Sequence, residues 1–78
     1  MAEKGEGIDV PIFVNNVKYD IARGPETVAH IKQIGHVPSA DVLEELLDGK
    51  LQPLSDTATV DVHGGEHFVS HPRTGSSS

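Results

Sequence analysis

The chain of 78 residues contains no cysteine and no tryptophan, and its only aromatic residues are one tyrosine and two phenylalanines. Without cysteine there is no disulfide scaffold, no thiolate metal site and no cysteine nucleophile. With so few aromatic side chains, the core must be built mainly from valine, isoleucine and leucine. A chain of this length forms one domain with a thin core, which is stable only where its local structural signals agree.

Long apolar runs are also missing. No segment approaches the roughly 20 apolar residues that a membrane-spanning helix needs. The N-terminal sequence MAEKGEGIDVP has none of the apolar character of a secretory signal. We therefore expect a cytoplasmic protein that neither crosses nor binds a membrane.

Clustered positive charge is the third absence. The six basic residues are scattered along the chain, no two of them are adjacent, and twelve acidic residues bring the net charge to −6. A surface that binds nucleic acid gathers basic residues along the phosphate backbone. We therefore expect no nucleic-acid partner, and the acidic excess is typical of a solvated surface.

The two ends of the sequence carry little that could be buried. Residues 1–10 mix charges with two glycines and predict a disordered N-terminal arm. Residues 73–78, RTGSSS, predict a flexible C-terminal tail. The folded domain is expected to span residues 11–72.

Strict alternation in PIFVNNVKYDI predicts a β-hairpin. Asn15 and Asn16 separate the two runs, and asparagine tolerates the positive φ of tight hairpin turns. The alternation places Phe13 on the outer face and five other side chains on the face toward the core. The inward set is Ile12, Val14, Val17, Tyr19 and Ile21.

The segment GPETVAHIKQIG predicts a helix with one apolar stripe. Val28, Ile31 and Ile34 recur every three residues along it. Pro25 suits the first helical turn, and Gly35 suits a left-handed residue at the C-terminal end. We expect this helix to pack on a β-sheet.

The segment SADVLEELLDGK fits two structures. Its apolar residues have helical spacing, with Ser39 as the N-cap and Gly49 as the stop, and local spacing narrowly favours this helix. The alternative is a strand that turns at Asp48 and Gly49 into a short strand over residues 51–54. Local propensity does not decide between them, because tertiary context often overrides it.

The closing segment TATVDVHGGEHFVSHP predicts a second hairpin. With a three-residue loop of Gly64, Gly65 and Glu66, Val62 lies opposite Phe68 and both side chains face inward. The glycine pair is then a turn inside the domain and not a site of conjugation.

Five histidines raise the question of a metal site. In the expected hairpin, His63 lies opposite His67 on the outer face, where two imidazoles could share a transition metal. A site needs three or four ligands, and no carboxylate spacing completes one, so we expect exposed histidines and no metal. No nucleophile elbow or phosphate-binding loop is present, so we expect neither enzymatic activity nor a cofactor.

Hairpin, helix and further strands follow one another in the order of the β-grasp fold. The hairpin IFVNNVKYDI, the helix and exit TVAHIKQIGHVP and the closing VDVHGGEHFVSHP resemble the bacterial ubiquitin-like domains called multiubiquitin domains, over roughly residues 11–72. The segment LQPLSD looks like the loop that precedes the final strand of ubiquitin. The resemblance implies an α+β fold, a ubiquitin-like β-grasp whose mixed four- to five-stranded sheet packs on one helix. It also implies that DVLEELL is a strand.

The same resemblance implies a protein modifier of a bacterial conjugation system, with a role in antiviral defence. Its partners would be ubiquitin-activating-like and conjugating-like enzymes, a processing protease and target proteins. In such modifiers the activating enzyme adenylates the carboxylate of a terminal glycine, whose lack of a Cβ allows close approach. Here, trimming of the last three serines would make Gly75 the conjugation site, with Arg73 and Thr74 as tail-recognition residues.

Two other functions are compatible with the same fold. One is a non-covalent interaction module that docks through the outward-facing Phe13 and Val69. The other is a sulfur carrier of the thiamine or molybdopterin type, which needs a terminal di-glycine, whereas this sequence ends in three serines.

Overall fold

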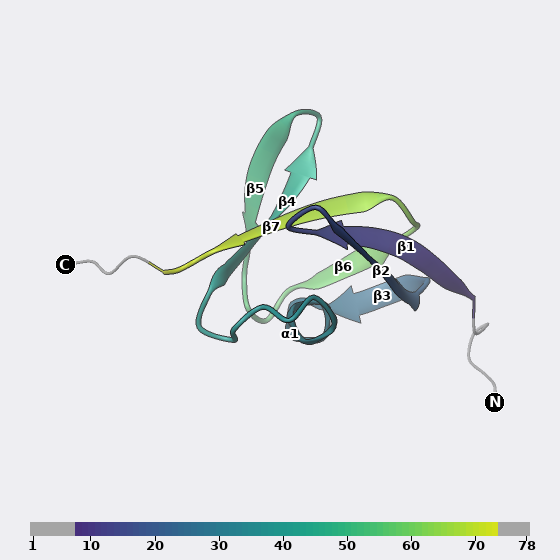
Figure 1. Ribbon diagram of the computed structural model, residues 1–78, viewed down its shortest axis with the longest axis horizontal. Coiled ribbons are helices and arrows are strands. Elements are labelled where there is room, and N and C mark those ends of the chain that lie inside the picture. The colour runs from purple at the N-terminus through teal and green to yellow at the C-terminus, as the bar shows by residue number, and fades with distance from the viewer. Residues whose placement is uncertain (1–7, 74–78) are drawn as a thin grey trace.

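The structure, a computed structural model, describes residues 8–73; the expected arm and tail, with Thr74 and Gly75, fall mostly outside this range. It contains seven strands and one helix (Figure 1). No helix within residues 8–73 has the length and apolar character that crossing a membrane requires. The elements are β1 (Asp9–Val14), β2 (Val17–Ala22), β3 (Gly24–Thr27), α1 (Val28–Ile34), β4 (Val42–Leu47), β5 (Lys50–Leu54), β6 (Thr59–Val62) and β7 (Glu66–His71).

Five of the strands form one mixed sheet in the order β2-β1-β7-β4-β5. Its centre is the parallel pairing of β1 with β7, and the other neighbours are antiparallel. The helix packs on one face of this sheet (Figure 1), beside a second, two-stranded sheet of β3 and β6. The expected α+β class, with a mixed five-stranded sheet and one helix, is confirmed; the two-stranded sheet was not expected.

The opening hairpin is confirmed. Asn15 and Asn16 have φ values of 53° and 68° and join β1 to β2, with Val14 and Val17 as register partners. β1 begins at Asp9, two residues before the expected start of the domain, and Val10 packs against the core. Val17, expected in the core, is instead 51% exposed; it is the first residue of β2, which is an edge strand.

The helix begins three residues later than Pro25 suggests. Pro25 lies in β3, opposite Asp61 of β6, and the N-cap of α1 is Thr27, whose Oγ1 accepts a hydrogen bond from the His30 N–H at 3.1 Å. A threonine cap satisfies an N–H of the first turn that proline cannot. Val28 and Ile31 are buried, as expected from their spacing.

The prediction of a left-handed Gly35 is wrong. Its φ is −82°, and the positive φ falls on the next residue, His36, at 59°. A Cβ at Gly35 would lie 2.8 to 2.9 Å from the Cγ1 and Cβ of Val14. Glycine is needed here because the end of α1 approaches β1 closely, and not because of backbone conformation.

The segment that fitted either a helix or a strand is strand β4. It turns at Asp48 and Gly49, whose φ values are 51° and 79°, into the antiparallel β5. The helical alternative is wrong, because β4 supplies the antiparallel neighbour of β7 and buries Leu43 in the core. In Figure 1 the far half of this hairpin projects away from the rest of the molecule.

The predicted second hairpin is wrong. β6 pairs with β3, whereas β7 pairs with β1 and β4, so residues 63–65 connect the two sheets. Val62 and Phe68 are both buried, as expected, but they are not register partners. Gly64 and Gly65 have φ values of 112° and 88°, which favour glycine. The Gly65 N–H donates to the Pro11 carbonyl, which fixes the start of β7 beside β1.

The core lies between the large sheet, the helix and the two-stranded sheet. It consists entirely of aliphatic side chains and one phenylalanine. Its members are Ile12, Val14, Ile21, Val28, Ile31, Val37, Leu43, Val60, Val62 and Phe68.

Candidate functional site

The residues that the sequence singled out gather on and around β7. Phe13 and Val69 lie on the face of the large sheet opposite α1, because they alternate with the buried Val14 and Phe68. Arg73 follows the end of β7 and is the last residue that the structure describes. Thr74 and Gly75 lie outside the described residues.

The outer face of the sheet carries an apolar group that we call the outer patch, formed by Phe13, His67, Val69, Leu46 and Leu51. Phe13 and His67 are register partners, and their rings stack with centroids 4.6 Å apart and an angle of 11° between their planes. Leu46 and Leu51 are cross-strand partners that are 42% and 46% exposed. Exposed apolar and aromatic side chains on one face of a sheet are suited to contact with another protein.

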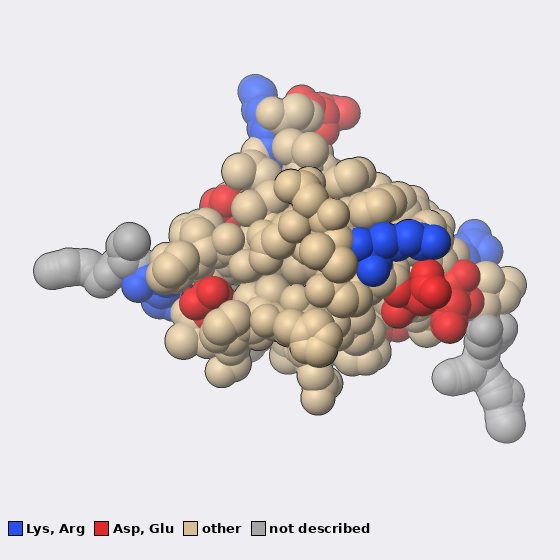
Figure 2. All heavy atoms as spheres, viewed as in Figure 1, with Lys and Arg blue, Asp and Glu red and all other residues tan. Residues whose placement is uncertain are grey.

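The outer patch continues toward the tip of the β4–β5 hairpin. The pairing between β4 and β7 ends at Glu45, so Leu46 and Leu47 lie on the part of the hairpin that projects from the sheet (Figure 1). On the face that Figure 2 shows, charged side chains form small groups of either sign, one of them at this tip, and no continuous basic surface. This face is therefore unsuited to following a nucleic-acid backbone.

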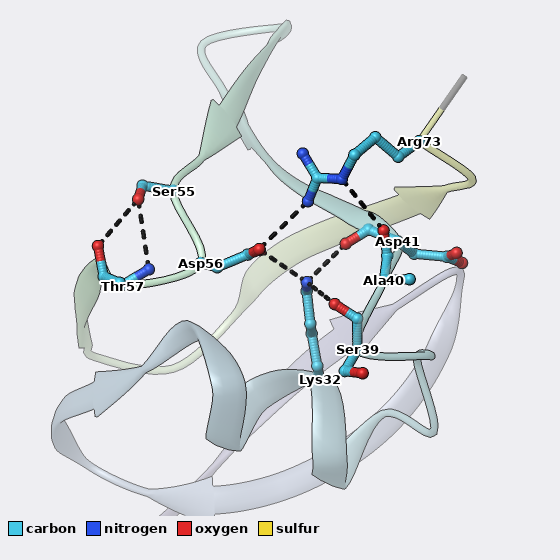
Figure 3. A network of polar contacts seen from close by, with 8 residues as sticks. All are labelled: Lys32, Ser39, Ala40, Asp41, Ser55, Asp56, Thr57 and Arg73. Carbon is cyan, nitrogen blue, oxygen red and sulfur yellow. Dashed lines mark hydrogen bonds and ion pairs between the residues drawn. The ribbon is translucent and has the colours of Figure 1, made fainter. Parts of the chain in front are cut away.

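Lys32 is the centre of a polar network beneath the end of β7 (Figure 3). Lys32 is only 4% exposed. Its Nζ donates to the carbonyl oxygens of Ser39 and Asp41 and to Oδ1 of Asp56, at 3.0, 2.5 and 2.9 Å. An ammonium group has three hydrogens, so every one of them has an acceptor. The lysine thereby joins α1 to the chain before β4 and to the turn after β5.

Arg73 reaches the same network from just beyond β7 (Figure 3). Its Nη2 lies 3.2 Å from Oδ2 of Asp56, and its Nε donates to the Ala40 carbonyl at 3.3 Å. Asp56 thus binds Lys32 with one carboxylate oxygen and Arg73 with the other. The contact joins the chain just after β7 to the turn after β5.

Asp56 is held in its charged form by these partners. The hydrogen bond from Lys32 is the main cause that lowers the pKa of the Asp56 carboxyl, and the charges of Lys32 and Arg73 lower it further. The turn that carries it is closed by Ser55, whose Oγ accepts from the Thr57 N–H. Ser55 and Asp56 therefore make structural contacts with this turn, Lys32 and Arg73.

A pair of carboxylates, Glu45 and Glu66, lies on the inner side of the sheet. Desolvation by burial, and next the charge of Glu66, raise the pKa of the Glu45 carboxyl. Glu66 itself accepts hydrogen bonds from the N–H groups of His63 and Gly64 at 2.7 and 2.9 Å. These bonds hold the glycine loop that connects the two sheets.

The histidines do not form a metal site within residues 8–73, where no group of three or more suitable side chains occurs. His63 and His67 are not opposite each other, since β6 and β7 are not paired. His63 lies 3.4 Å from Asp61, and His71 lies 3.6 Å from Glu44 on the outer face.

A hollow of about 760 Å³ lies beside α1, with Lys32 and Asp56 in its wall. All three hydrogens of Lys32 are already donated, so the lysine offers none to a ligand. The ring of His30, also in this wall, is bonded to Glu26 at 2.6 Å. The hollow therefore has no free donor on Lys32, and we assign it no ligand.

The network around Lys32 is the part of the site that the sequence analysis missed. One signal was present: Lys32 follows the buried Val28 by four residues, which places both on the same face of a helix. Its acceptors lie 7, 9 and 24 residues further along the chain, so no local pattern could identify them.

Comparisons with models of protein families, with curated proteins and with solved structures find no match to this chain.

Proposed function

We propose that the chain is a ubiquitin-like protein modifier, attached to other proteins through a glycine in the segment that follows β7. One observation carries the proposal: β7, the last strand within residues 8–73, lies in the centre of the sheet between β1 and β4, and Arg73, just after it, is bound to Asp56. This sheet order, with parallel first and last strands and one packed helix, is compatible with a β-grasp. A modifier needs such a rigid body with an exit from which an enzyme can take up the C-terminal segment.

The chemistry would take place at Gly75. A protease hydrolyses the bond between Gly75 and Ser76, which leaves a glycine carboxylate. An activating enzyme joins this carboxylate to the AMP part of ATP and releases pyrophosphate. An enzyme thiol then displaces AMP to form a thioester, and an amine of the target displaces the thiol to form an amide.

The test uses two forms of the protein, the full chain and a chain that ends at Gly75. Each is incubated with ATP in extract of the source cells, and the products are measured by intact mass and by peptide mapping. We expect ATP-dependent conjugates in which the Gly75 carboxylate is joined to a target amine. The shorter form should not need trimming and should react sooner.

The matched controls are Gly75→Asp in the shorter form, where a charged Cβ substituent should abolish conjugation, and omission of ATP. Conjugates that form equally in all cases would be nonspecific. An absence of any adduct from the shorter form would contradict the proposal. A terminal thiocarboxylate would instead indicate a sulfur carrier. It would be detected as the mass increase that results when sulfur replaces one carboxylate oxygen.

The outer patch supports a second candidate function, a non-covalent docking module. Its stacked Phe13 and His67 and the exposed Val69 lie on the outer face of the large sheet. If this function is the correct one, Phe13→Ala and Val69→Ser abolish partner binding, while removal of residues 74–78 leaves it unchanged. The modifier requires the opposite dependence on the tail.

A further inference from the structure

The two edges of the large sheet differ in their capacity to accept another strand. β5 carries Pro53, which has no N–H, whereas β2 contains no proline. In the β4–β5 hairpin the pair that flanks the two-residue turn, Leu47 and Lys50, is hydrogen-bonded, and bonded and non-bonded pairs alternate from there. The pair of Glu44 and Pro53 is three positions further on and is therefore non-bonded, so the missing N–H of Pro53 falls on the free edge. β5 is therefore a poor template for strand addition, whereas β2, which has β1 as its one neighbour within residues 8–73, is an open one.

The hydrogen bonds of β1 and β2 show which groups of β2 are free. The Arg23 N–H donates to the Ile8 carbonyl at 2.8 Å, just beyond the paired ends of the two strands. Because antiparallel bonding alternates along a strand, Tyr19 and Ile21 also bond to β1. Lys18 and Asp20 then direct their N–H and C=O groups away from β1, toward the open edge.

Lys18 and Asp20 have opposite charges, so the β2 strands of two copies can be complementary to each other. Lys18 and Asp20 are both exposed and lie on the same face of the sheet, two residues apart. If two copies of β2 pair antiparallel about Tyr19, each Lys18 lies opposite Asp20 of the other copy. The residues with free backbone groups are then the residues with matching charges, and a two-fold axis gives this pair twice.

We propose that the β2 edge is a self-association surface whose partner is a second copy of this chain, joined through antiparallel β2 strands centred on Tyr19. The pairing would also cover Val17, which is half exposed in the single chain. It would extend the two five-stranded sheets into one. The proposal is independent of the proposed function, because neither β2 nor its edge belongs to the tail.

Charge exchange between the two positions gives a direct test. Lys18→Glu places two acidic residues opposite each other, and Asp20→Lys places two basic residues opposite each other. Each variant alone should associate about tenfold more weakly than the wild type, since two attractive cross-strand pairs become repulsive. An equimolar mixture of the two variants should associate as the wild type does, because both pairs in the mixed dimer are attractive again.

Association of the full chain is measured by sedimentation equilibrium from micromolar to millimolar concentration at low salt. The matched controls are Lys50→Glu and Asp61→Lys, which change the net charge by the same amounts at exposed positions of β5 and β6. They should leave association unchanged. A wild type that stays monomeric throughout, or a mixture that associates no better than its components, overturns the proposal.

A second measurement uses the wild type alone, so it does not depend on how the variants fold. With rising concentration, amide exchange at Lys18 and Asp20 should slow, because their N–H groups become bonded. The amides of Tyr19 and Ile21, already bonded to β1, should change little. Concentration-dependent protection confined to the β4–β5 hairpin would place any interface at the exposed leucines and contradict the assignment.

Discussion

At the scale of single residues, Lys32 combines a buried charge with a complete set of acceptors. It is the only charged residue among residues 8–73 that is buried, and it binds one carboxylate and two backbone carbonyls. Desolvation of an ammonium group is costly, and only such complete bonding offsets it. The network therefore holds three segments together while adding little to stability by itself.

Removal of the Lys32 ammonium should lower the stability by more than the small net contribution of the intact network. Lys32→Met keeps most of the side-chain volume but leaves the carbonyls of Ser39 and Asp41 without their donor. We expect a loss of about 1–3 kcal/mol in the free energy of unfolding. Urea denaturation measures it, and Lys50→Met on the exposed hairpin is the control, with a change within about 0.5 kcal/mol. Equal losses in both variants would contradict the role of the network.

Asp56 should make stability fall in acid. Its pKa is lowered by Lys32 and Arg73, so the folded protein binds this proton less tightly than the unfolded chain does. The stabilisation is present above the ordinary aspartate pKa and is lost as the pH falls through the lowered value. Asp56→Asn should therefore be less stable at neutral pH and show a shallower decline in acid. Urea denaturation at several pH values checks this, and parallel declines in both proteins would refute it.

Glu45 should act in the opposite direction. Burial and the charge of Glu66 raise its pKa, so the folded protein binds this proton more tightly than the unfolded chain does. Its contribution is greatest below the ordinary glutamate pKa and is lost as the pH rises through the raised value. Glu45→Gln should therefore gain stability over the wild type at neutral pH, and the difference should shrink in acid. A difference that does not vary with pH would show that the carboxylate is not the cause.

At the scale of elements, the local sequence predicts the structure correctly where the turn residues are characteristic of one turn type. The Asn15-Asn16 turn predicted the first hairpin, and its positive φ values confirm the reason for it. The chain over residues 39–48 was ambiguous, because apolar spacing there fits both a helix and a strand. Its strand conformation is stabilised by pairing with β7, a contact that local patterns do not contain.

The end of α1 provides a test of close packing between elements. Gly35→Ala puts a methyl group against Val14 without straining the backbone, since φ is negative there. We expect a loss of about 1–3 kcal/mol from overpacking. In a Val14→Ala background the same change should cost less but still carry a penalty, because the contacts with Cγ1 and Cγ2 are lost while the contact with Cβ at 2.9 Å remains. Chemical denaturation of the four proteins gives the coupling energy, and additive effects would argue against a clash.

At the scale of the whole molecule, the sequence predicted the classes of element better than their partners. The alternation around Gly64 and Gly65 predicted a hairpin, because alternation defines which face of a strand is buried but not which strand lies beside it. The structure divides these strands between two sheets. For the same reason Arg73 was recognised as a tail residue, while its contact with Asp56, 17 residues earlier, could not be foreseen.

The central position of β7 has a consequence for the order in which the molecule is assembled. β7 is the only link between the β1–β2 and β4–β5 hairpins, and it is the last strand of the described chain to be synthesised. An isolated two-stranded hairpin is at best marginally stable in water. Until β7 has left the ribosome, the two hairpins therefore have no shared sheet to join. The domain can fold only once β7 has emerged, and a chain cut within residues 63–65 would lose the large sheet as a whole.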